Sequence, residues 1–326
     1  MSERISTKDI RAMDPGSRIE TTLLVRKSSQ RETKAGSPYV ALTLGDEFGD
    51  LEGRAWSTDL GGEGPPAPGT VLTVGGKVSE WRGETQISVD HWTVKQDQDL
   101  SGLVPSAHLP GERLWQMVRD DIEKLCEGDV KKLTLYVLDA LKDKLVAYPA
   151  AQGHHHARLS GLIQHISSML ELLHRVEVTY RPRYERELDT SIVAAAIVFH
   201  DLGKVLELSG PVGTEYTDVG RAVGHIAMGV QMLESAQLVS RVSLDEHEVT
   251  HLNHLILSHH GKKEWGSPVE PCTPEAILLH QLDMMDSRMD AALTAAASAG
   301  EGDRWVSMGH GDLFVGRFGV EGGSDE

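Results

Sequence analysis

The segment from Ile192 to Lys204 reads IVAAAIVFHDLGK, and it decides how the second half of the chain folds. Its first eight residues are apolar, which predicts a helix that is buried on all sides. A His200-Asp201 pair at the end of such a helix is costly to bury unless both side chains are satisfied, and a bound metal ion satisfies both. Gly203 permits a chain turn beside the pair, and Lys204 supplies a positive charge suited to a phosphate oxygen.

Other predicted helices also present histidine or aspartate at an apolar end or edge. These residues are His165 beside the apolar stripe of a helix from residue 158, His225 at the start of another helix, His259-His260 at the end of the helix 252–258, and Asp283 on a mostly apolar helix face. Each one alone is explicable as a core, capping or surface residue. Of 16 histidines, however, 14 lie between positions 108 and 280. Because histidine is the commonest metal ligand among side chains, the group predicts a metal site.

Apolar residues recur at helical spacing from Leu114 onward. They predict helices over residues 114–125, 133–145, 158–180, 188–200, 220–240, 245–260 and 273–297. Residues 113–299 are therefore expected to form an all-α domain. Residues 300–326 are rich in glycine and acidic side chains, so we expect a loose C-terminal tail in which the apolar Leu313-Phe314-Val315 docks.

The first 97 residues have a different pattern. Segments rich in Val, Leu, Thr and Trp at 19–27, 38–46, 50–56, 70–81 and 85–95 alternate with turn residues. Five short strands of this kind are typical of an OB-type barrel, and Gly75-Gly76 suits the bulge that barrel closure needs. Pro105 and Pro110 mark residues 98–112 as a linker. We therefore expect a multidomain α and β protein, with an N-terminal five-stranded OB-type β-barrel followed by an all-α helical bundle.

The charge of the chain restricts its function class. The 326 residues include 32 basic and 49 acidic side chains, a net charge of −17. Up to Leu100 there are 12 basic and 16 acidic side chains, so the excess of acid is mostly in the helical part. This balance argues against a passive nucleic-acid binder, which normally has a basic surplus. It does not exclude an enzyme on nucleic acid, because bound divalent cations would cancel several of these charges.

The sequence also indicates the compartment. No stretch approaches the ~18 uninterrupted apolar residues of a membrane span, and residues 1–14 lack the apolar core of a signal peptide. We therefore expect a cytoplasmic protein with no membrane partner. Cys126 and Cys272 do not form a CxxC pair, which disfavours a disulfide framework and a thiolate zinc site. We expect both cysteines to be small buried residues.

The order of the candidate ligands is similar to that of the HD superfamily of metal phosphohydrolases. The flanking segments narrow this resemblance to the YhaM-type 3′→5′ exoribonucleases, which pair an N-terminal OB-fold with a C-terminal HD domain. These segments are HHA (155–157), GLIQH (161–165), HDLGK (200–204), ELSGP (207–211), EYT (215–217), GHI (224–226) and LILSHHGK (255–262). The resemblance spans essentially the whole chain. His154 replaces an amide residue that is usual in the family, and Ser160 replaces a second glycine.

The resemblance implies two divalent metal ions per chain. One ion would take His165, His200, Asp201 and Asp283, and the other would take His225, His259 and His260, with Asp201 bridging the two. Imidazole and carboxylate ligands suit Mn²⁺, Co²⁺, Fe²⁺, Ni²⁺ or Zn²⁺, and the family points to Mn²⁺. Two ions roughly 3.5–4 Å apart can activate a water molecule and stabilise both the attacking and the leaving oxygen, without a protein nucleophile.

Further side chains are assigned to the reacting phosphate. Lys204 and Lys262 would counter its charge, while His155 or His156 would contact it or protonate the leaving group.

In the barrel, the aromatic residues Trp56, Trp81, Trp92 and Tyr39 are candidates to stack on bases, although two of the four are expected to fill the core. Basic residues, Lys27 and Arg54 among them, would line a groove for the nucleic-acid backbone.

Three functions remain open at this point. The leading hypothesis is an exonuclease that trims single-stranded RNA from the 3′ end and releases nucleoside 5′-monophosphates, with single-stranded DNA as a further substrate class. The first alternative is an HD phosphohydrolase of small or cyclic nucleotides, against which the attached barrel argues. The second is a non-catalytic OB-fold nucleic-acid-binding protein, against which the full ligand set argues. The native metal and the oligomeric state, including a homo-oligomer, are left open.

Overall fold

The computed structural model describes residues 4–33, 36–56, 64–95, 100, 102–151, 158–180, 188–212, 214–300, 302–308 and 311–318. The chain divides into two compact units. The first comprises Met1–Ser106 with Gly210–Thr214, and the second comprises Ala107–Ser209 with Glu215–Glu326.

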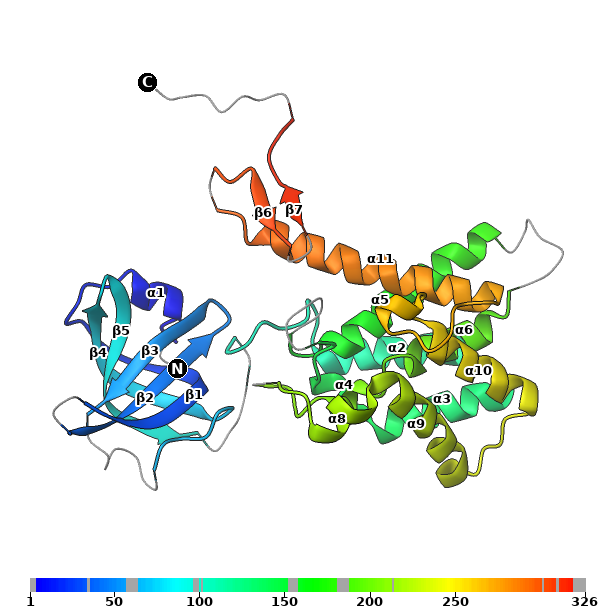
Figure 1. Cartoon of the computed structure of the whole chain (residues 1–326), viewed down its shortest axis with the longest axis horizontal. Helices are drawn as coiled ribbons and strands as arrows, with labels where there is room; N and C mark the ends of the chain where they lie inside the picture. The colour runs from blue at the N-terminus through cyan, green and yellow to red at the C-terminus, as the bar shows by residue number, and fades with distance from the viewer. Residues whose placement is uncertain are drawn as a thin grey trace. The chain divides into compact units, whose positions relative to one another are not determined.

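The first unit is a closed barrel in which the strands neighbour one another in the order β1-β2-β3-β5-β4 (Figure 1). Its strands are β1 (Arg18–Glu32), β2 (Pro38–Asp46), β3 (Gly49–Ala55), β4 (Val71–Trp81) and β5 (Glu84–Val94). Strand β1 pairs with both β2 and β4, and β3 pairs with β5 in parallel. The expected OB-type barrel is confirmed.

The glycine pair in β4 closes the barrel as expected. The register of β4 against β5 shifts between Gly75 and Gly76. A side chain at Gly76 would place its Cβ 2.2 Å from the carbonyl oxygen of Ser88, so the two backbones approach too closely for any other residue.

Helix α1 (Thr7–Arg11) precedes the strands and is not predicted by the sequence reasoning above. It begins with a capping box in which Ser6 and Asp9 exchange hydrogen bonds. The backbone amide of Thr7 donates to the buried carboxylate of Asp46 at 2.7 Å, which ties the helix to the end of β2.

The aromatic residues of the barrel divide between core and surface. Trp92 is buried in the core, whereas Trp56 and Trp81 are each 54% exposed. Tyr39 is partly buried and packs against Trp56, with ring centroids 5.3 Å apart. The guanidinium group of Arg54 lies 5.4 Å from the ring centroid of Trp81. Among the described residues of the barrel, Trp56, Trp81 and Phe48 are thus the exposed aromatic side chains.

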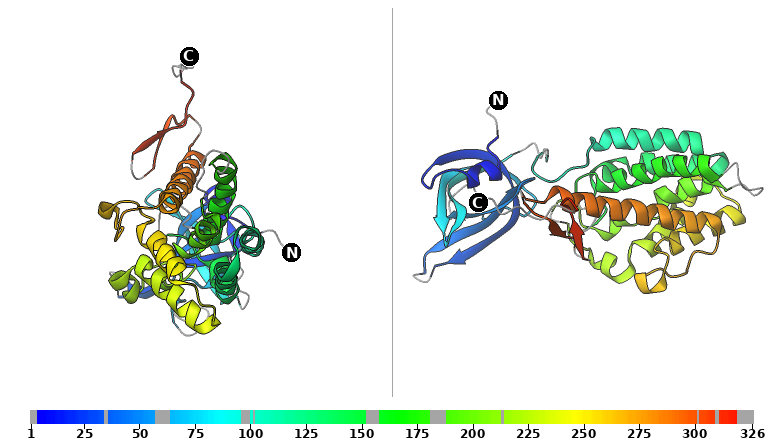
Figure 2. Two further views of the ribbon diagram at one scale, coloured as in Figure 1. Left: turned by 90° about the vertical axis from the view of Figure 1, so that its right-hand side faces the viewer. Right: turned by 90° about the horizontal axis from the view of Figure 1, so that it is seen from above.

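The second unit is a bundle of helices. They are α2 (Gly111–Leu125), α3 (Gly128–Ala140), α4 (Lys142–Ala147), α5 (Gly161–Tyr180), α6 (Thr190–Phe199), α7 (Lys204–Glu207), α8 (Asp218–Val223), α9 (His225–Ser240), α10 (Glu246–Ser258), the 3-10 helix η2 (Lys263–Trp265) and α11 (Pro274–Ala297). Helices α5 and α11 lie side by side (Figure 2).

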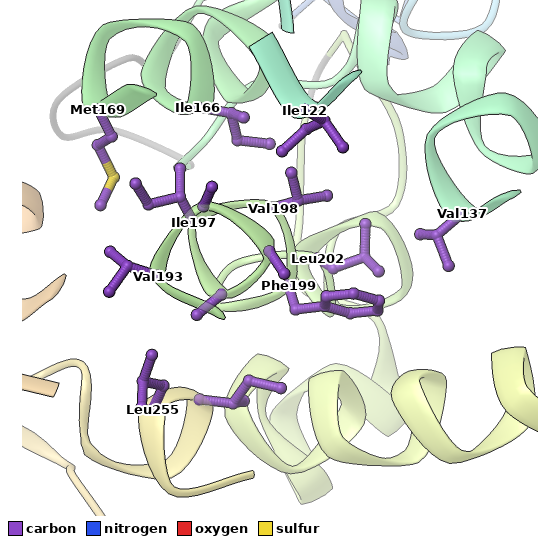
Figure 3. Packing of buried hydrophobic residues seen from close by; sticks show 14 of the residues in the cluster. Ile122, Val137, Ile166, Met169, Val193, Ile197, Val198, Phe199, Leu202 and Leu255 are labelled. Carbon is purple, nitrogen blue, oxygen red and sulfur yellow. The ribbon is translucent and has the colours of Figure 1, made fainter. Parts of the chain in front are cut away.

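Helix α6 forms the centre of this bundle, as its apolar sequence predicts. Every residue from Ile192 to Phe199 is buried. Figure 3 shows α6 enclosed by neighbouring helices, with Ile166 and Met169 of α5 on one side and Leu255 of α10 on the other. The polar residues that follow Phe199 are therefore held at a fixed place inside the bundle.

The element boundaries differ from the predictions at three places. The predicted helix 133–145 is two helices, α3 and α4. The predicted helix 220–240 is divided into α8 and α9 by Gly224, whose φ of 77° belongs to the left-handed region. The tail is not simply loose, because β6 (Trp305–Ser307) and β7 (Asp312–Phe314) form a hairpin that follows α11 (Figure 1).

The expected linker is also more structured than the sequence suggested. Leu103 and Val104 are buried, and the guanidinium group of Arg26 donates to the carbonyl oxygen of Leu103 at 3.0 Å. This part of residues 98–112 is therefore packed rather than exposed.

The two cysteines have different surroundings. Cys126 is buried as expected, and burial raises the pKa of its thiol to about 12. Cys272 is exposed, so the expectation that it is buried was wrong. It lies in the chain between α10 and α11, with its Sγ atom 3.3 Å from Nε2 of His254. Among the described residues, none of the helices has the length and apolar character needed to span a membrane.

Candidate metal centre

The candidate ligands come from five helices of the second unit. His165 lies in α5, His200 is the C-cap of α6, His225 is the first residue of α9, His259 is the C-cap of α10, and Asp283 lies in α11; Asp201 and His260 follow the two C-caps. Residues that are up to 118 positions apart in the sequence thus meet at one place. The structure brings together all the predicted ligands.

Glycine at position 203 allows this meeting. A Cβ atom at Gly203 would lie 2.1 Å from the carbonyl oxygen of His225. The turn after Asp201 therefore touches the backbone at the start of α9 directly, and any larger residue would separate these two segments. The sequence indicated a chain turn here, and the structure shows that this turn packs against the backbone of His225.

The ligand atoms form two groups among the residues that the structure describes. One group is His165, His200 and Asp283, and the other is His225, His259 and His260; within each group the ligand atoms lie within 4.8 Å of one another. These are the two sets that the sequence resemblance implies.

Asp201 lies between the two groups. Its Oδ2 atom is 3.4 Å from Nε2 of His200 and 3.8 Å from Nε2 of His165. Its Oδ1 atom is 3.4 Å from Nε2 of His225 and 3.9 Å from Nε2 of His259. Each carboxylate oxygen therefore faces one group, which is the arrangement that a bridging ligand needs.

Hydrogen bonds at the opposite ring nitrogens orient the histidines. Nδ1 of His200 donates to the carbonyl oxygen of Ile197 at 2.8 Å, and Nδ1 of His259 donates to that of Ile256 at 2.7 Å. Because a carbonyl oxygen can only accept, the proton of each neutral ring is at Nδ1 and the lone pair is at Nε2. Nδ1 of His260 donates in the same way to the carbonyl oxygen of Trp265 at 3.1 Å.

Carboxylates take this role for the other two histidines. Nδ1 of His225 lies 3.2 Å from Oε1 of Glu207, which also accepts the backbone amide of His225 at 3.0 Å. Nδ1 of His165 lies 2.7 Å from Oδ2 of Asp286. A carboxylate behind a metal-bound histidine fixes the tautomer and makes the imidazole a better ligand. Each group of three thus contains one histidine supported by a carboxylate.

The donor atoms in the centre need a cation. In the described part of the chain, Oδ1 of Asp201, Nε2 of His225 and Nε2 of His259 are buried without a hydrogen-bond partner. Leaving such a polar atom unsatisfied costs about 1–3 kcal/mol. Nε2 of His165 and Nε2 of His200 also face each other at 3.3 Å. Divalent cations would satisfy all of these atoms at once, so the residues fit the metals that the sequence implies.

The pKa values of the ligands shift in two directions, since carboxylates favour a cation at His165 whereas burial disfavours a charged His259. Burial disfavours the charged form of His165, but Asp283 and Asp286 outweigh it and raise the pKa of His165 to about 10. Burial also opposes ionisation of Asp201, but Lys204 and His200 hold the pKa of this carboxyl well below its usual range. Burial, with smaller effects of His200 and His260, lowers the pKa of His259. A proton at Nε2 of His165 and a metal ion would compete for the same lone pair.

The two lysines assigned to the phosphate occupy different positions. Nζ of Lys204 donates to Oδ2 of Asp201 at 2.6 Å, and its side chain is 12% exposed. Lys262 lies at the surface, with Nζ 3.6 Å from Oε1 of Glu264 and 4.8 Å from the ring centroid of Trp265. The structure therefore places Lys204 in the centre and Lys262 at its margin.

The remaining predicted site residues lie elsewhere. His155 and His156 fall outside the described residues. Trp56, Trp81 and Arg54 belong to the barrel, as does Lys27, which is exposed on β1 opposite Thr43 of β2.

The sequence reasoning missed the two supporting carboxylates. Asp286 lies one helical turn after Asp283 on α11, so the spacing could have indicated it. Glu207 lies in the segment ELSGP, to which no role was assigned.

Comparison with known proteins gives matches over most of the chain. The HD domain family matches residues 162–288. The 3′-5′ exoribonuclease YhaM of Bacillus subtilis (strain 168) is 34% identical over 286 residues, which cover 87% of this chain and 89% of that protein. The 3′-5′ exoribonuclease YhaM of Bacillus licheniformis is 33% identical over 292 residues, which cover 88% and 91%. Among solved structures, the p204 HINb domain aligns at 19% identity over 28% of this chain and 47% of that chain, with a TM-score of only 0.24.

Proposed function

The chain belongs to the family of the 3′-5′ exoribonuclease YhaM, and we propose that it hydrolyses single-stranded RNA from the 3′ end to nucleoside 5′-monophosphates at a centre of two divalent metal ions. The observation that carries this proposal is the position of Asp201 between two groups of ligands, with buried donor atoms that have no hydrogen-bond partner in the described part of the chain. Single-stranded DNA is a second substrate to be tested.

The ligands are assigned from these two groups. His165, His200 and Asp283 would hold one ion, His225, His259 and His260 would hold the other, and Asp201 would contribute one oxygen to each. When bound, two such ions, for which we propose Mn²⁺, polarise a water molecule and offset the charge of the phosphate. Glu207 and Asp286 keep two of the imidazoles in the orientation and tautomer that this requires.

Lys204 is proposed to act on the substrate from within the centre. Its ammonium group is held at Asp201, in a place where few water molecules reach it. Divalent cations at the two carboxylate oxygens of Asp201 would weaken this ion pair, which leaves the ammonium group able to donate to a phosphate oxygen. Lys262 would approach the phosphate from the margin. For His156 we keep the role of proton donor to the leaving oxygen, and for His155 a contact to the phosphate.

The barrel is proposed to hold the strand before it reaches the centre. Trp56 and Trp81 expose their rings to solvent, and Arg54 lies beside one of them. Exposed aromatic rings beside cationic side chains are what OB-folds use to bind single strands without sequence preference. Lys27 would contact the backbone. This feature favours a polymer over the small or cyclic nucleotides of the alternative function.

The test is a time course with RNA labelled at either end. With Mn²⁺, RNA labelled at the 5′ end should shorten one nucleotide at a time, while RNA labelled at the 3′ end should release labelled 5′-monophosphate at once. A circular RNA of the same sequence should resist. If the circle is cut as fast as the linear strand, the exonuclease assignment is wrong. If only mononucleotides or cyclic nucleotides are hydrolysed, the alternative function is correct.

A further inference from the structure

An anchored turn follows the candidate ligand His260. In this turn the amide of Trp265 donates to the carbonyl oxygen of Lys262 at 3.0 Å. Just beyond it, the buried hydroxyl group of Ser267 lies 2.8 Å from the carbonyl oxygen of Val269 and 3.0 Å from that of Leu257, so its one proton is shared between the two acceptors. These hydrogen bonds hold η2 against the end of α10.

The backbone of Trp265 is part of the metal centre's support. Its carbonyl oxygen accepts the Nδ1 proton of His260 at 3.1 Å, and this bond aims Nε2 of His260 at the other ligands. The tryptophan is therefore one hydrogen bond away from a candidate ligand. Trp265 therefore lies at the edge of the candidate metal centre.

The ring of Trp265 is not part of the core. It is 45% exposed, although the backbone that carries it is tied down. Its neighbours are the ring of His280, at a centroid distance of 6.1 Å and a tilt of 38°, and the ammonium group of Lys262, 4.8 Å from its centroid. The ammonium group lies over the ring. A base that stacks on the ring would therefore displace it or use the opposite face, and the positive charge would then be close to the adjoining phosphate.

We propose that Trp265 stacks on a base that flanks the scissile phosphodiester and that Lys262 contacts the adjoining phosphate. The inference rests on the proposed nuclease function and names the substrate contact at the centre itself. The second unit would then have a nucleic-acid-binding site of its own, in addition to Trp56 and Trp81 of the barrel. The site would accept any of the bases, because stacking uses the face of the base and not its hydrogen-bonding edge.

The first test compares variants of Trp265 on one substrate. Trp265→Ala should raise KM for a short oligoribonucleotide ~10-fold, since one stacked base contributes on that order. Trp265→Phe should recover most of this loss, because it keeps a flat ring. The metal content of both variants should stay the same as that of the wild-type protein. Trp305→Ala is the matched control, since Trp305 is 60% exposed in the same unit but belongs to the β6–β7 hairpin.

The second test removes the base instead of the ring. Oligoribonucleotides that lack the base at the last, the second-last or the fourth-last position are compared on the wild-type protein and on Trp265→Ala. If the ring stacks on a flanking base, removal of the base at one of the last two positions should raise KM for the wild-type protein but not raise it further for Trp265→Ala. Removal of the fourth-last base should change KM by the same factor for both proteins.

The proposal for Trp265 would be overturned if removal of the last base and removal of the second-last base each raise KM by the same factor in Trp265→Ala as in the wild-type protein. Loss of metal from Trp265→Phe would also overturn it. A wild-type protein that does not shorten RNA at all would instead overturn the proposed function.

Discussion

Replacement of Asp286 should weaken one of the two metal sites and leave the other intact. Oδ2 of Asp286 lies 2.7 Å from Nδ1 of His165, and the carboxylate is 12% exposed, so little water can take its place. Loss of such a supporting carboxylate costs about 10- to 100-fold in metal affinity, which corresponds to about 1.4–2.7 kcal/mol. Asp286→Asn keeps an acceptor oxygen and loses the charge, so it should fall near the lower value, and Asp286→Ala near the upper one.

The assay is metal binding rather than turnover. Equilibrium dialysis against Mn²⁺ should give two tight equivalents for the wild-type protein and one tight plus one weakened equivalent for Asp286→Ala. Glu207→Gln should also weaken one equivalent, on the side of His225, and the double variant should weaken both. The coupled spectrum of a Mn²⁺ pair in electron paramagnetic resonance should be lost together with the weakened equivalent.

A matched control comes from another histidine–carboxylate pair. Nε2 of His174 lies 3.4 Å from Oδ1 of Asp121. Asp121→Asn removes a carboxylate from a partly exposed histidine that is not a candidate ligand, so both equivalents should remain tight. If Asp286→Ala binds both equivalents as tightly as the wild-type protein does, Asp286 does not support a metal ligand and its proposed role is wrong.

Three further predictions concern the stability of the protein and the reactivity of its two cysteines. Gly203→Ala should lower the free energy of unfolding by about 1–3 kcal/mol, because its Cβ would meet a backbone oxygen at 2.1 Å, whereas Gly210→Ala has nothing within 4 Å and should be neutral in chemical denaturation. Ser160 has a φ of 61°, so Ser160→Gly should keep or raise the free energy of unfolding, because glycine adopts this φ without strain. Ser160→Ala should lower it by about 1 kcal/mol, because alanine keeps the strain and loses the hydroxyl hydrogen bond. Equal unfolding midpoints for the two variants would contradict this. Iodoacetamide at pH 8 should label Cys272 and spare Cys126, whose raised pKa keeps its thiol neutral, as peptide mass analysis can show.

The barrel was predictable where its strands are amphipathic and less so elsewhere. The segment from Ser28 to Glu32 continues β1 as a polar, mostly exposed extension, paired with residues 38–42 of β2, and no apolar alternation indicates it. Helix α1 is only five residues long, too short for a hydrophobic period, although its capping box from Ser6 to Asp9 is visible in the sequence. The alternation of polar and apolar residues predicts strands that bury one face. A polar strand such as this extension of β1 forms because a neighbouring strand pairs with its backbone, and its own sequence does not show that.

The candidate ligands were predictable because each one stands at the end of an apolar segment or on an apolar helix. The atoms that orient them were not, because most of these atoms are backbone carbonyls, such as those of Ile197 and Trp265, which have no signature in a sequence. The reason for the departure at Ser160 also appears only in three dimensions. Its positive φ is one that glycine adopts more easily than serine, and its hydroxyl group donates to the carbonyl oxygen of Val146 at 2.6 Å, which partly offsets the strain.

The charge of the centre bears on the number of ions. When every imidazole is neutral, as metal binding requires, the carboxylates of Asp201, Asp283, Asp286 and Glu207 and the ammonium group of Lys204 leave three net negative charges. One divalent ion would leave the centre negative and repel a phosphodiester, which carries one negative charge. Two divalent ions would leave it with one positive charge, which matches the substrate. The supporting carboxylates therefore do more than orient two histidines, because their charge would let the centre bind two cations and still release a phosphate product.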